Sequence, residues 1–585
     1  MAICPPKKID SNITGLRYAI ERCLGELPAN PVWNVLEPNS YSDLGGQVTT
    51  VARNPINPSR SRKKGVVTDL EASGGFNQDI TQSNTTDLLQ GVMFADARER
   101  GTTASLVHGQ ATVSDVDGTA GTYEFNNIGA VGVVATAGGA GYRVGDLLAY
   151  GTGAQRSARF YVTAVSPTGA VTAVAVDDAG LRNDSPAGAL AVTGGSGAGA
   201  TVTVTWGDAL PDFMPGALVF ASGFSTAANN GVKTVVSHAA GVLTVAGGLV
   251  DETPPATAKV QTVGFRFEAG DLSVTMNGGL PRLTNAAAID FAAFGFIPGE
   301  WLYLDGFSNN GGFARIGTID PDGEYIEFDK VEWHPVAEAE TGVVVSLYLG
   351  TIIRNEPDPG LIKRRSYHIE RTLGQDTEGN MAEYLIGAVA NEFTLNVAQA
   401  DKVTVDVSFI AIDSESRTGA QGLKAGARPS LLVEDAFNTS SDFHRIKLSA
   451  VDPLLANPRP LFAFSTDMTL TINNNVSANK AIGVLGAFDT TAGTFEVGGS
   501  LTTYFANMDA VQAVRNNADV TMDFIVVKNN AALLFDIPLL ALGNGRLNVE
   551  QDQPVTLPLD TSAAESKFGH TLLFQSFPYL PSSAG

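Results

Sequence analysis

The segment 391–416, NEFTLNVAQADKVTVDVSFIAIDSES, shows a clear β-strand pattern, which indicates the fold class of this chain. Apolar residues alternate with polar ones from 393 to 397, and again from 403 to 409. Alternation with a period of two places apolar side chains on one face of a β-strand and polar side chains on the other. The segment AQAD between the two runs predicts a hairpin turn. Three residues occupy polar positions of the second run: Thr404, Asp406 and Ser408.

The sequence on the C-terminal side continues in the same manner. The segment 519–542, DVTMDFIVVKNNAALLFDIPLLAL, predicts two further strands around an Asn-Asn turn. A short helix is expected at 508–516, MDAVQAVRN. We therefore expect an all-β fold with one or two short helices. No strand here has obvious edge protection, so we expect strands of neighbouring copies to pair into a closed or spiralling sheet whose polar faces line a lumen.

The first hundred residues combine one helical pattern with strands. Apolar residues at helical spacing predict a helix within 16–24. Val48–Arg53 and Gly65–Leu70 predict the two strands of a long hairpin, and prolines between them exclude a regular ladder at its tip. The tip carries four basic residues: Arg60, Arg62, Lys63 and Lys64. In an acidic chain, these charges favour docking against an acidic neighbouring subunit over binding nucleic acid.

The middle region, 101–355, is dense in Gly, Ala, Val and Thr and contains an internal repeat. FMPGALVFASGF begins at Phe213 and FIPGEWLYLDGF begins at Phe296, and each continues into an Asn/Gly turn. The repeats, about 207–265 and 290–350, predict two small β-barrels. Before them, a Gly-rich block at about 129–206 predicts a separate all-β module. We expect this whole region to be inserted into the core and to be dispensable for assembly.

Composition excludes several classes of protein. The chain has 585 residues and a net charge of −23, which argues against sequence-specific DNA binding. Its two cysteines, Cys4 and Cys23, cannot form a disulfide framework and are expected to be reduced thiols. We expect neither a signal peptide nor a membrane span, because no apolar run is long enough.

No motif for catalysis, cofactors or metals stands out. The six histidines are scattered, without the spacing of metal ligands. The GxGxxA at Gly195 runs into an expected strand, whereas a dinucleotide fingerprint opens a helix. Asp115–Gly118 and Asp320–Asp329 are similar to calcium loops but lack the EF-hand spacing, so acidic β-turns are expected. We expect no enzyme activity, cofactor or metal.

Several segments together resemble the major tail tube proteins of siphophages, which are long-tailed bacteriophages. These segments occur in the right order over about 1–100 and 360–585. They are TTVARNPINPSRSRKKGVVTDLEASGGFNQDIT (49–81), LLQGVMFA (88–95), KRRSYHIERTLG (363–374), EYLIGAVANEFTLNV (383–397), KVTVDVSFIAID (402–413), YFANMDAVQAVRNNADVTMDFIV (504–526), DIPLLALGNGRLNVEQDQPVTLPLD (536–560) and FPYLPS (577–582).

The resemblance implies a tail tube β-sandwich or barrel core, formed by 1–100 and 356–585, with 101–355 as inserted β decoration. It implies a structural virion protein that forms hexameric rings, stacked through the long hairpin into the conduit for genome delivery. The implied partners are other copies, a tape-measure protein, a tail terminator and phage DNA that passes without specific binding. It also implies assembly in the host cytoplasm and no membrane partner.

Two other functions compete with this interpretation. Gly-rich β repeats also build phage tail adhesins and carbohydrate-binding tail proteins, which would use exposed aromatic residues such as Trp301, Tyr303 and Trp333. A polysaccharide-cleaving enzyme would need convergent carboxylates, and Asp320–Glu332 is the only dense cluster of them.

Overall fold

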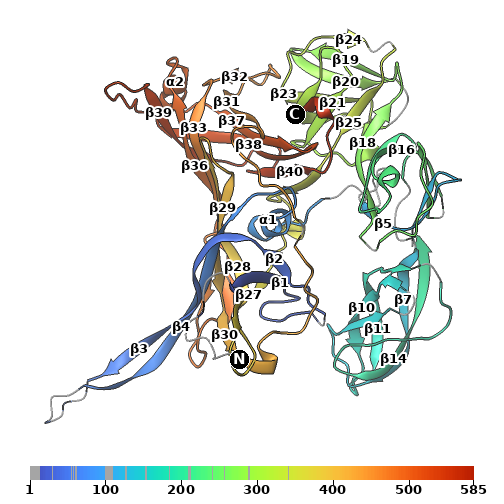
Figure 1. Ribbon diagram of the computed structural model, residues 1–585, viewed down its shortest axis with the longest axis vertical. Coiled ribbons are helices and arrows are strands. Elements are labelled where there is room, and N and C mark those ends of the chain that lie inside the picture. The colour runs from blue at the N-terminus through green and yellow to red at the C-terminus, as the bar shows by residue number, and fades with distance from the viewer. Residues whose placement is uncertain are drawn as a thin grey trace, which may run out of the picture.

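Strands make up most of the protein, as its computed structural model shows (Figure 1). The structure describes residues 9, 13–28, 30–54, 56, 58, 62–98, 110–125, 128–151, 154–182, 185–208, 213–239, 241–255, 257–286, 290–339, 342–431 and 433–584. Within them lie two α-helices, α1 (Thr86–Met93) and α2 (Asp509–Arg515). The predicted all-β fold is confirmed, and α2 falls inside the segment where a helix was predicted.

The core of the molecule is one network of seventeen hydrogen-bonded strands. Its strands are β1 (Gly15–Ile20), β2 (Asn34–Leu36), β3 (Pro38–Arg53), β4 (Lys63–Asp79), β26 (Thr351–Arg354), β27 (Tyr367–Gln375), β28 (Asn380–Ala398), β29 (Thr404–Ala411), β30 (Asp413–Arg417), β31 (Phe443–Ala450), β32 (Arg459–Pro460), β33 (Ser465–Asn473), β36 (Glu496–Tyr504), β37 (Val520–Lys528), β38 (Ala531–Asn544), β39 (Thr556–Ala563) and β40 (Leu573–Phe577). A small hairpin, β34 (Ser477–Asn479) and β35 (Asp489–Thr491), lies beside it.

An unbroken antiparallel ladder runs through this network in the order β3, β4, β29, β28, β33, β36, β39, β38, β37 and β31. Segments from both ends of the chain therefore build one sheet. Its apolar side chains form a single large cluster, against which α1 packs Leu88, Leu89 and Val92. The alternation at 393–397 and 403–409 supplies buried residues to this cluster from β28 and β29.

The helix expected within 16–24 is wrong. Leu16 and Tyr18 belong to β1, which pairs with β2 on one side and with β27 on the other. Cys23 and Glu26 then form a turn, with the Glu26 N–H donating to the Cys23 carbonyl. A strand followed by a tight turn reproduced the helical spacing by chance, because the window was short.

The second large sheet holds thirteen strands and contains the two repeats. Its strands are β5 (Gln110–Asp117), β6 (Thr122–Phe125), β15 (Ala217–Ser222), β16 (Gly231–Ala239), β17 (Val242–Ala246), β18 (Lys259–Phe267), β19 (Leu272–Asn277), β20 (Leu280–Asn285), β21 (Trp301–Asp305), β22 (Gly312–Ile319), β23 (Tyr325–Val331), β24 (Glu338–Ala339) and β25 (Val345–Tyr348). In the first unit, β15, β16, β17, β6, β5 and β18 close into a ring, because β18 pairs back with β15. The pairing of β18 with β25 joins this barrel to the second unit, whose strands follow in the order β25, β21, β22, β23, β20, β19 and β24. Among the described residues no strand pairing closes this second sheet into a ring, and we use the name second barrel for it only because it contains the second repeat.

The two repeats share a set of side-chain hydrogen bonds that the sequence alone did not reveal, centred in each unit on a partly exposed carboxylate. In the first unit, the Glu252 carboxylate accepts hydrogen bonds from the Ser225 and Thr226 N–H groups and from the Asn229 side chain. In the second, Glu338 accepts from the corresponding groups of Ser308, Asn309 and Asn310. The two barrels therefore close their Asn/Gly turns in the same way.

The Gly-rich module is a third, self-contained unit. Its strands are β7 (Ile128–Ala140), β8 (Leu147–Tyr150), β9 (Ala154–Arg156), β10 (Ala158–Val165), β11 (Val171–Asp178), β12 (Leu181–Arg182), β13 (Leu190–Ala191) and β14 (Ala198–Asp208). They form two small sheets around their own apolar cluster. Ile128 and Asp208 are paired, so the chain enters and leaves the module at neighbouring points. Figure 1 shows the module beside the first barrel, away from the hairpin β3–β4.

Candidate assembly surfaces

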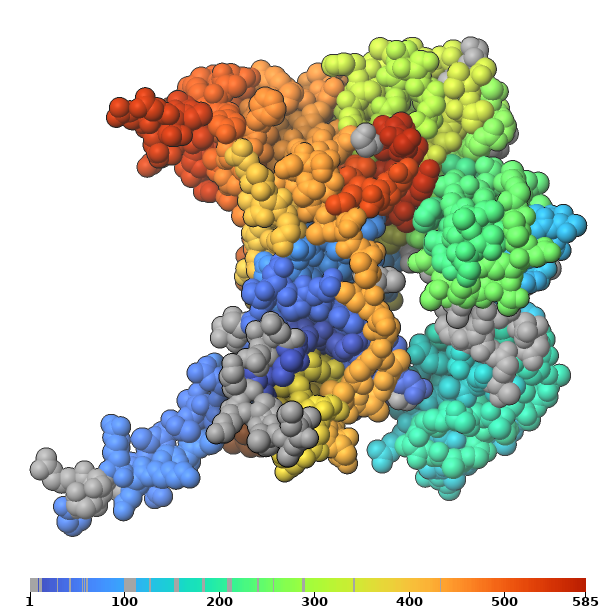
Figure 2. Space-filling model, viewed as in Figure 1, coloured from blue at the N-terminus to red at the C-terminus, as the bar shows by residue number. Residues whose placement is uncertain are grey.

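The long hairpin β3–β4 projects from the core as a narrow arm (Figures 1 and 2). Beyond Leu70 both faces of this two-stranded ribbon are open to solvent, and four valines on it are about half exposed: Val48, Val51, Val66 and Val67. Arg62, Lys63 and Lys64 are exposed near the tip, whereas Arg60 lies outside the described residues. At the root of the arm, Lys480 forms an ion pair of 2.5 Å with Asp69. The arm thus carries exposed apolar and basic groups.

Thr404, Asp406 and Ser408 lie together on the polar face of β29. The Asp406 carboxylate is exposed, and it accepts hydrogen bonds from the side-chain amides of Asn77 on β4, at 2.9 Å, and Asn396 on β28, at 2.6 Å. Thr404 and Ser408 are half-buried on either side of it. The cross-strand register continues this polar face from β4 to β39.

The polar face of the sheet is acidic. At the positions that alternate outward in 71–79, 392–398, 404–408, 467–473, 496–504 and 556–562, all of them described, no lysine or arginine occurs. The acidic residues at those positions are Glu71, Asp79, Glu392, Asp406, Asp467, Glu496 and Asp560. Two lysines reach the face from outside these strands, since Lys402 pairs with Asp79 and Lys480 with Glu71. The face therefore carries a clear excess of negative charge.

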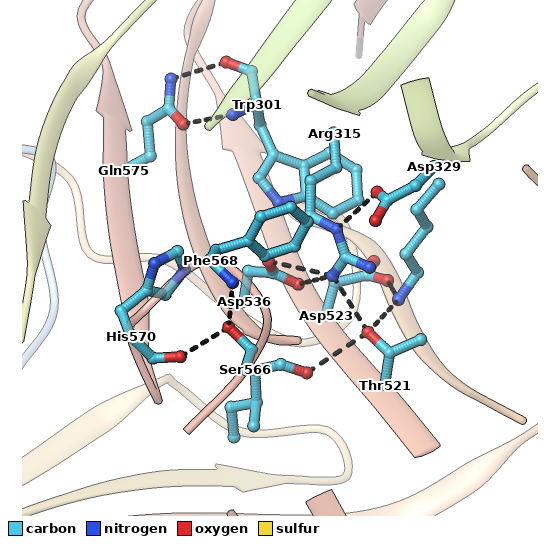
Figure 3. Close-up of polar contacts among 12 residues, drawn as sticks. Trp301, Arg315, Asp329, Thr521, Asp523, Asp536, Ser566, Phe568, His570 and Gln575 are labelled. Atoms are coloured by element: carbon cyan, nitrogen blue, oxygen red, sulfur yellow. Dashed lines mark hydrogen bonds and ion pairs between the residues drawn. The ribbon is translucent and has the colours of Figure 1, made fainter. Parts of the chain in front are cut away.

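The second barrel is fixed to the core by a buried interface. An apolar cluster there joins Trp301, Tyr303 and Phe313 of the barrel to Ile525 and Leu534 of the core. The Gln575 side chain bonds both backbone groups of Trp301, accepting from its N–H at 3.0 Å and donating to its carbonyl at 2.7 Å (Figure 3). The Gln575 side chain therefore links β21 of the barrel to β40 where backbone hydrogen bonds usually join two strands.

Charged residues lie buried or largely buried in the same interface, which we call the ionic joint: Arg315, Asp329, Lys330, Arg445, Asp523 and Asp536. Figure 3 labels four of them, Arg315, Asp329, Asp523 and Asp536. Arg315 donates to Asp329 at 2.9 Å and to Asp536 at 3.0 Å, so it spans barrel and core. Lys330 of the barrel pairs with Asp523 of the core, which also accepts from Arg445 at 2.6 Å. Three cations thus face three carboxylates, which offsets much of the cost of burying them.

Protonation at the joint follows from burial and from these pairs. Burial of Asp523 opposes its ionisation, but the charges of Arg445 and Lys330 outweigh this and lower its pKa to about 2. Burial raises the pKa of Asp536 above the usual value despite Arg315. The nearby His570 ring is buried beside Arg354 and Arg315, and its pKa falls to about 3. This histidine is therefore neutral near pH 7.

The aromatic residues proposed for carbohydrate binding are not available at the surface. Trp301, Tyr303 and Trp333 are all buried in apolar clusters, so the interpretation of them as an exposed binding platform is wrong. Trp301 and Tyr303 lie on β21, and its first four residues are all buried, so this strand has no exposed face on which they could stand. Asp320 caps a turn by accepting the Glu324 N–H. Among the described residues, no group of His, Cys, Asp or Glu is arranged to hold a metal ion.

Taken together, the surfaces are those of a β-protein that presents strands and acidic sheet faces. The sequence profile of the family described as phage tail tube protein matches residues 11–147 and 207–563. The chain belongs to this phage tail tube family, whose members are structural proteins of the phage tail that self-assemble into a tube. The unmatched segment, 148–206, falls within the Gly-rich module. A search of curated proteins finds no match, and no described helix is long and apolar enough to cross a membrane.

Proposed function

We propose that the chain polymerises as stacked rings, hexameric as its resemblance to siphophage proteins implies, into the conduit that delivers the phage genome. The observation that carries this proposal is the two-sided core sheet, with a large apolar cluster on one face and an acidic row on the other. When such sheets close around an axis, the acidic faces border the channel. Like-charge repulsion then keeps DNA from binding as it passes.

In this assembly Thr404, Asp406 and Ser408 face the lumen, and the hairpin with Arg60, Arg62, Lys63 and Lys64 docks on the next ring. An isolated two-stranded hairpin is marginal in water, so an arm with both faces exposed requires a partner to order it. The acidic excess of the chain provides one. The half-exposed valines of the arm add apolar area to the same contact.

The remaining partners follow from the same role. The tube forms around a tape-measure protein in the host cytoplasm and is closed by a tail terminator, and DNA passes without specific binding. The protein has no enzymatic function and needs no cofactor. We retain 1–100 and 356–585 as the two parts of the tube core and 101–355 as the inserted region, with the Gly-rich module as its outermost decoration. The last strand of that region, β26, is an exception, because it pairs with β40 in the core sheet.

Purified protein tests this proposal directly. Negative-stain microscopy is expected to show rings and tubes, and analytical ultracentrifugation is expected to show a broad series of large species. Monomers alone at every salt concentration, or a single closed dimer, would contradict the proposed function.

A further inference from the structure

The loop 480–488, between β34 and β35, carries an apolar surface that nothing within the described part of the chain covers. Ile482 is fully exposed, with an exposed fraction of 107%, and Val484, Leu485 and Phe488 are each about half exposed. Four exposed apolar side chains thus lie within seven residues of one loop, and exposed apolar patches mark interaction sites. We call this segment the apolar loop.

The apolar loop is held in a defined shape. The Ala487 N–H donates to the Ile412 carbonyl at 3.1 Å and the Phe488 N–H to the Asn479 carbonyl at 2.9 Å. Lys480 anchors its start to Asp69 at the root of the long hairpin. A loop that is already ordered loses little entropy on binding, so its exposed side chains are suited to a protein partner.

A cavity of about 520 Å³ lies at the other end of β33. Its apolar wall consists of Phe443, Ile446, Phe464 and Met468, and the ring of Phe464 is 73% exposed. The rest of its lining is largely polar: Gln399, Thr439, Ser440, His444, Arg445, Ser465, Thr466 and Asp467. The volume lies in the range of ~300–1,000 Å³ typical of sites that enclose a ligand group.

The loop and the cavity cannot meet within one chain. The first residues of β33 line the cavity, whereas the loop follows the C-terminal end of this strand. The strand between Asp467 and Asn473 spans ~20 Å, at about 3.3 Å per residue. The apolar loop and the apolar wall of the cavity can therefore meet only between copies, as a head-to-tail contact. Such heterologous contacts do not close on a dimer, but form larger rings or open filaments.

We propose that the apolar loop of one copy inserts into this cavity of a copy in the adjacent ring. The inference rests on the proposed stacking of rings and names a second contact between them, separate from the basic hairpin tip. Because the contact is apolar, raising the salt concentration does not weaken it, whereas the charged contact of the hairpin is screened.

Cross-linking of single-cysteine variants tests the pairing. In a background with Cys4→Ser and Cys23→Ser, Leu485→Cys and Phe464→Cys are introduced into separate chains and treated with a short thiol-specific cross-linker. A cross-linked dimer is expected only in tubes assembled from the mixture. Self-cross-linking of either variant, or no dimer from tubes of the mixture, would overturn the proposed contact.

A substitution series measures the importance of this contact for assembly. Ile482→Ser with Leu485→Ser is expected to raise the concentration required for tubes at least tenfold, while the melting temperature of the subunit stays close to that of wild type. Val134→Ser with Val144→Ser, two exposed valines of the Gly-rich module, is the matched control and is expected to assemble normally. If the loop variant and the wild type both assemble normally, the proposed loop contact is wrong, but the proposed function still stands. Absence of tubes from wild type overturns the proposed function and this contact with it.

Discussion

At the scale of single residues, the ionic joint depends on each charge having its partner. Lys330→Met leaves the buried carboxylate of Asp523 with Arg445 alone, and removing one partner of a buried pair costs ~3–5 kcal/mol. We therefore expect a clear fall in the denaturation midpoint, measured by urea titration. Lys363→Met is the control, because its pair with Asp96 is exposed and worth at most ~1 kcal/mol. Equal effects of the two changes would show that the joint contributes no more than a surface pair.

His570, beside the ionic joint, makes the free energy of unfolding depend on pH. The unfolded histidine binds a proton near pH 6.5, whereas the folded one does so only at about 3. Between these values the unfolded chain holds the extra proton, so stability falls as the pH falls, by about 1.4 kcal/mol per pH unit. Melting temperatures from pH 7 to pH 4 are expected to decline less steeply for His570→Gln. His334→Gln, at an exposed position, is expected to keep the slope of the wild type.

At the scale of elements, we expect the basic tip of the long hairpin to be required for elongation of the tube. Each exposed ion pair contributes only ~0.2–1 kcal/mol, but every subunit of every ring repeats it. Changing Arg60, Arg62, Lys63 and Lys64 to Ser should leave a folded subunit whose tubes are short or absent, as seen by negative-stain microscopy. Wild-type tubes are expected to shorten as salt rises.

A charge-matched control separates the tip from a general loss of positive charge. It carries Ser at four basic residues of the barrels and the module: Arg143, Arg159, Lys233 and Arg266. This control is expected to elongate as wild type does. If the tip variant also formed tubes of normal length, docking would have to rest on the backbone and valines of the arm.

At the scale of the whole molecule, the units differ in how they can be removed. The Gly-rich module has its own apolar cluster and adjacent entry and exit points, so replacing Ile128–Asp208 by a short Gly/Ser linker is expected to leave tubes that are thinner outside. Replacing Gly101–Asn355 would instead expose Asp523, Asp536 and the apolar surface beneath Trp301. We therefore expect the protein with the larger deletion to aggregate or unfold. This differs from the expectation from the sequence, which was that the whole of 101–355 is dispensable for assembly. Solubility, circular dichroism and microscopy distinguish the outcomes.

The features that depend on local pattern could be predicted from the amino-acid sequence. Alternation at 393–397 and 403–409 specified two strands and placed Asp406 on their polar face, because side chains of a strand alternate by geometry alone. The Asn529–Asn530 turn could be predicted because both residues tolerate the positive φ that a tight hairpin needs. The repeat at Phe213 and Phe296 was visible as repeated letters. Even so, a short window misplaced a helix over 16–24 and gave no sign of α1.

How distant segments combine became clear from the three-dimensional structure alone. The pairing of Lys330 with Asp523 joins residues far apart in the chain, and no spacing in the sequence encodes such a contact. Other features also depend on packing between elements. These are the burial of Trp301 and Trp333, the turns closed by Glu252 and Glu338, and the positions of the loop and the cavity near opposite ends of β33. Local pattern fixes which face of a strand is apolar, but the free energy of burying that face against other elements decides which segment covers it.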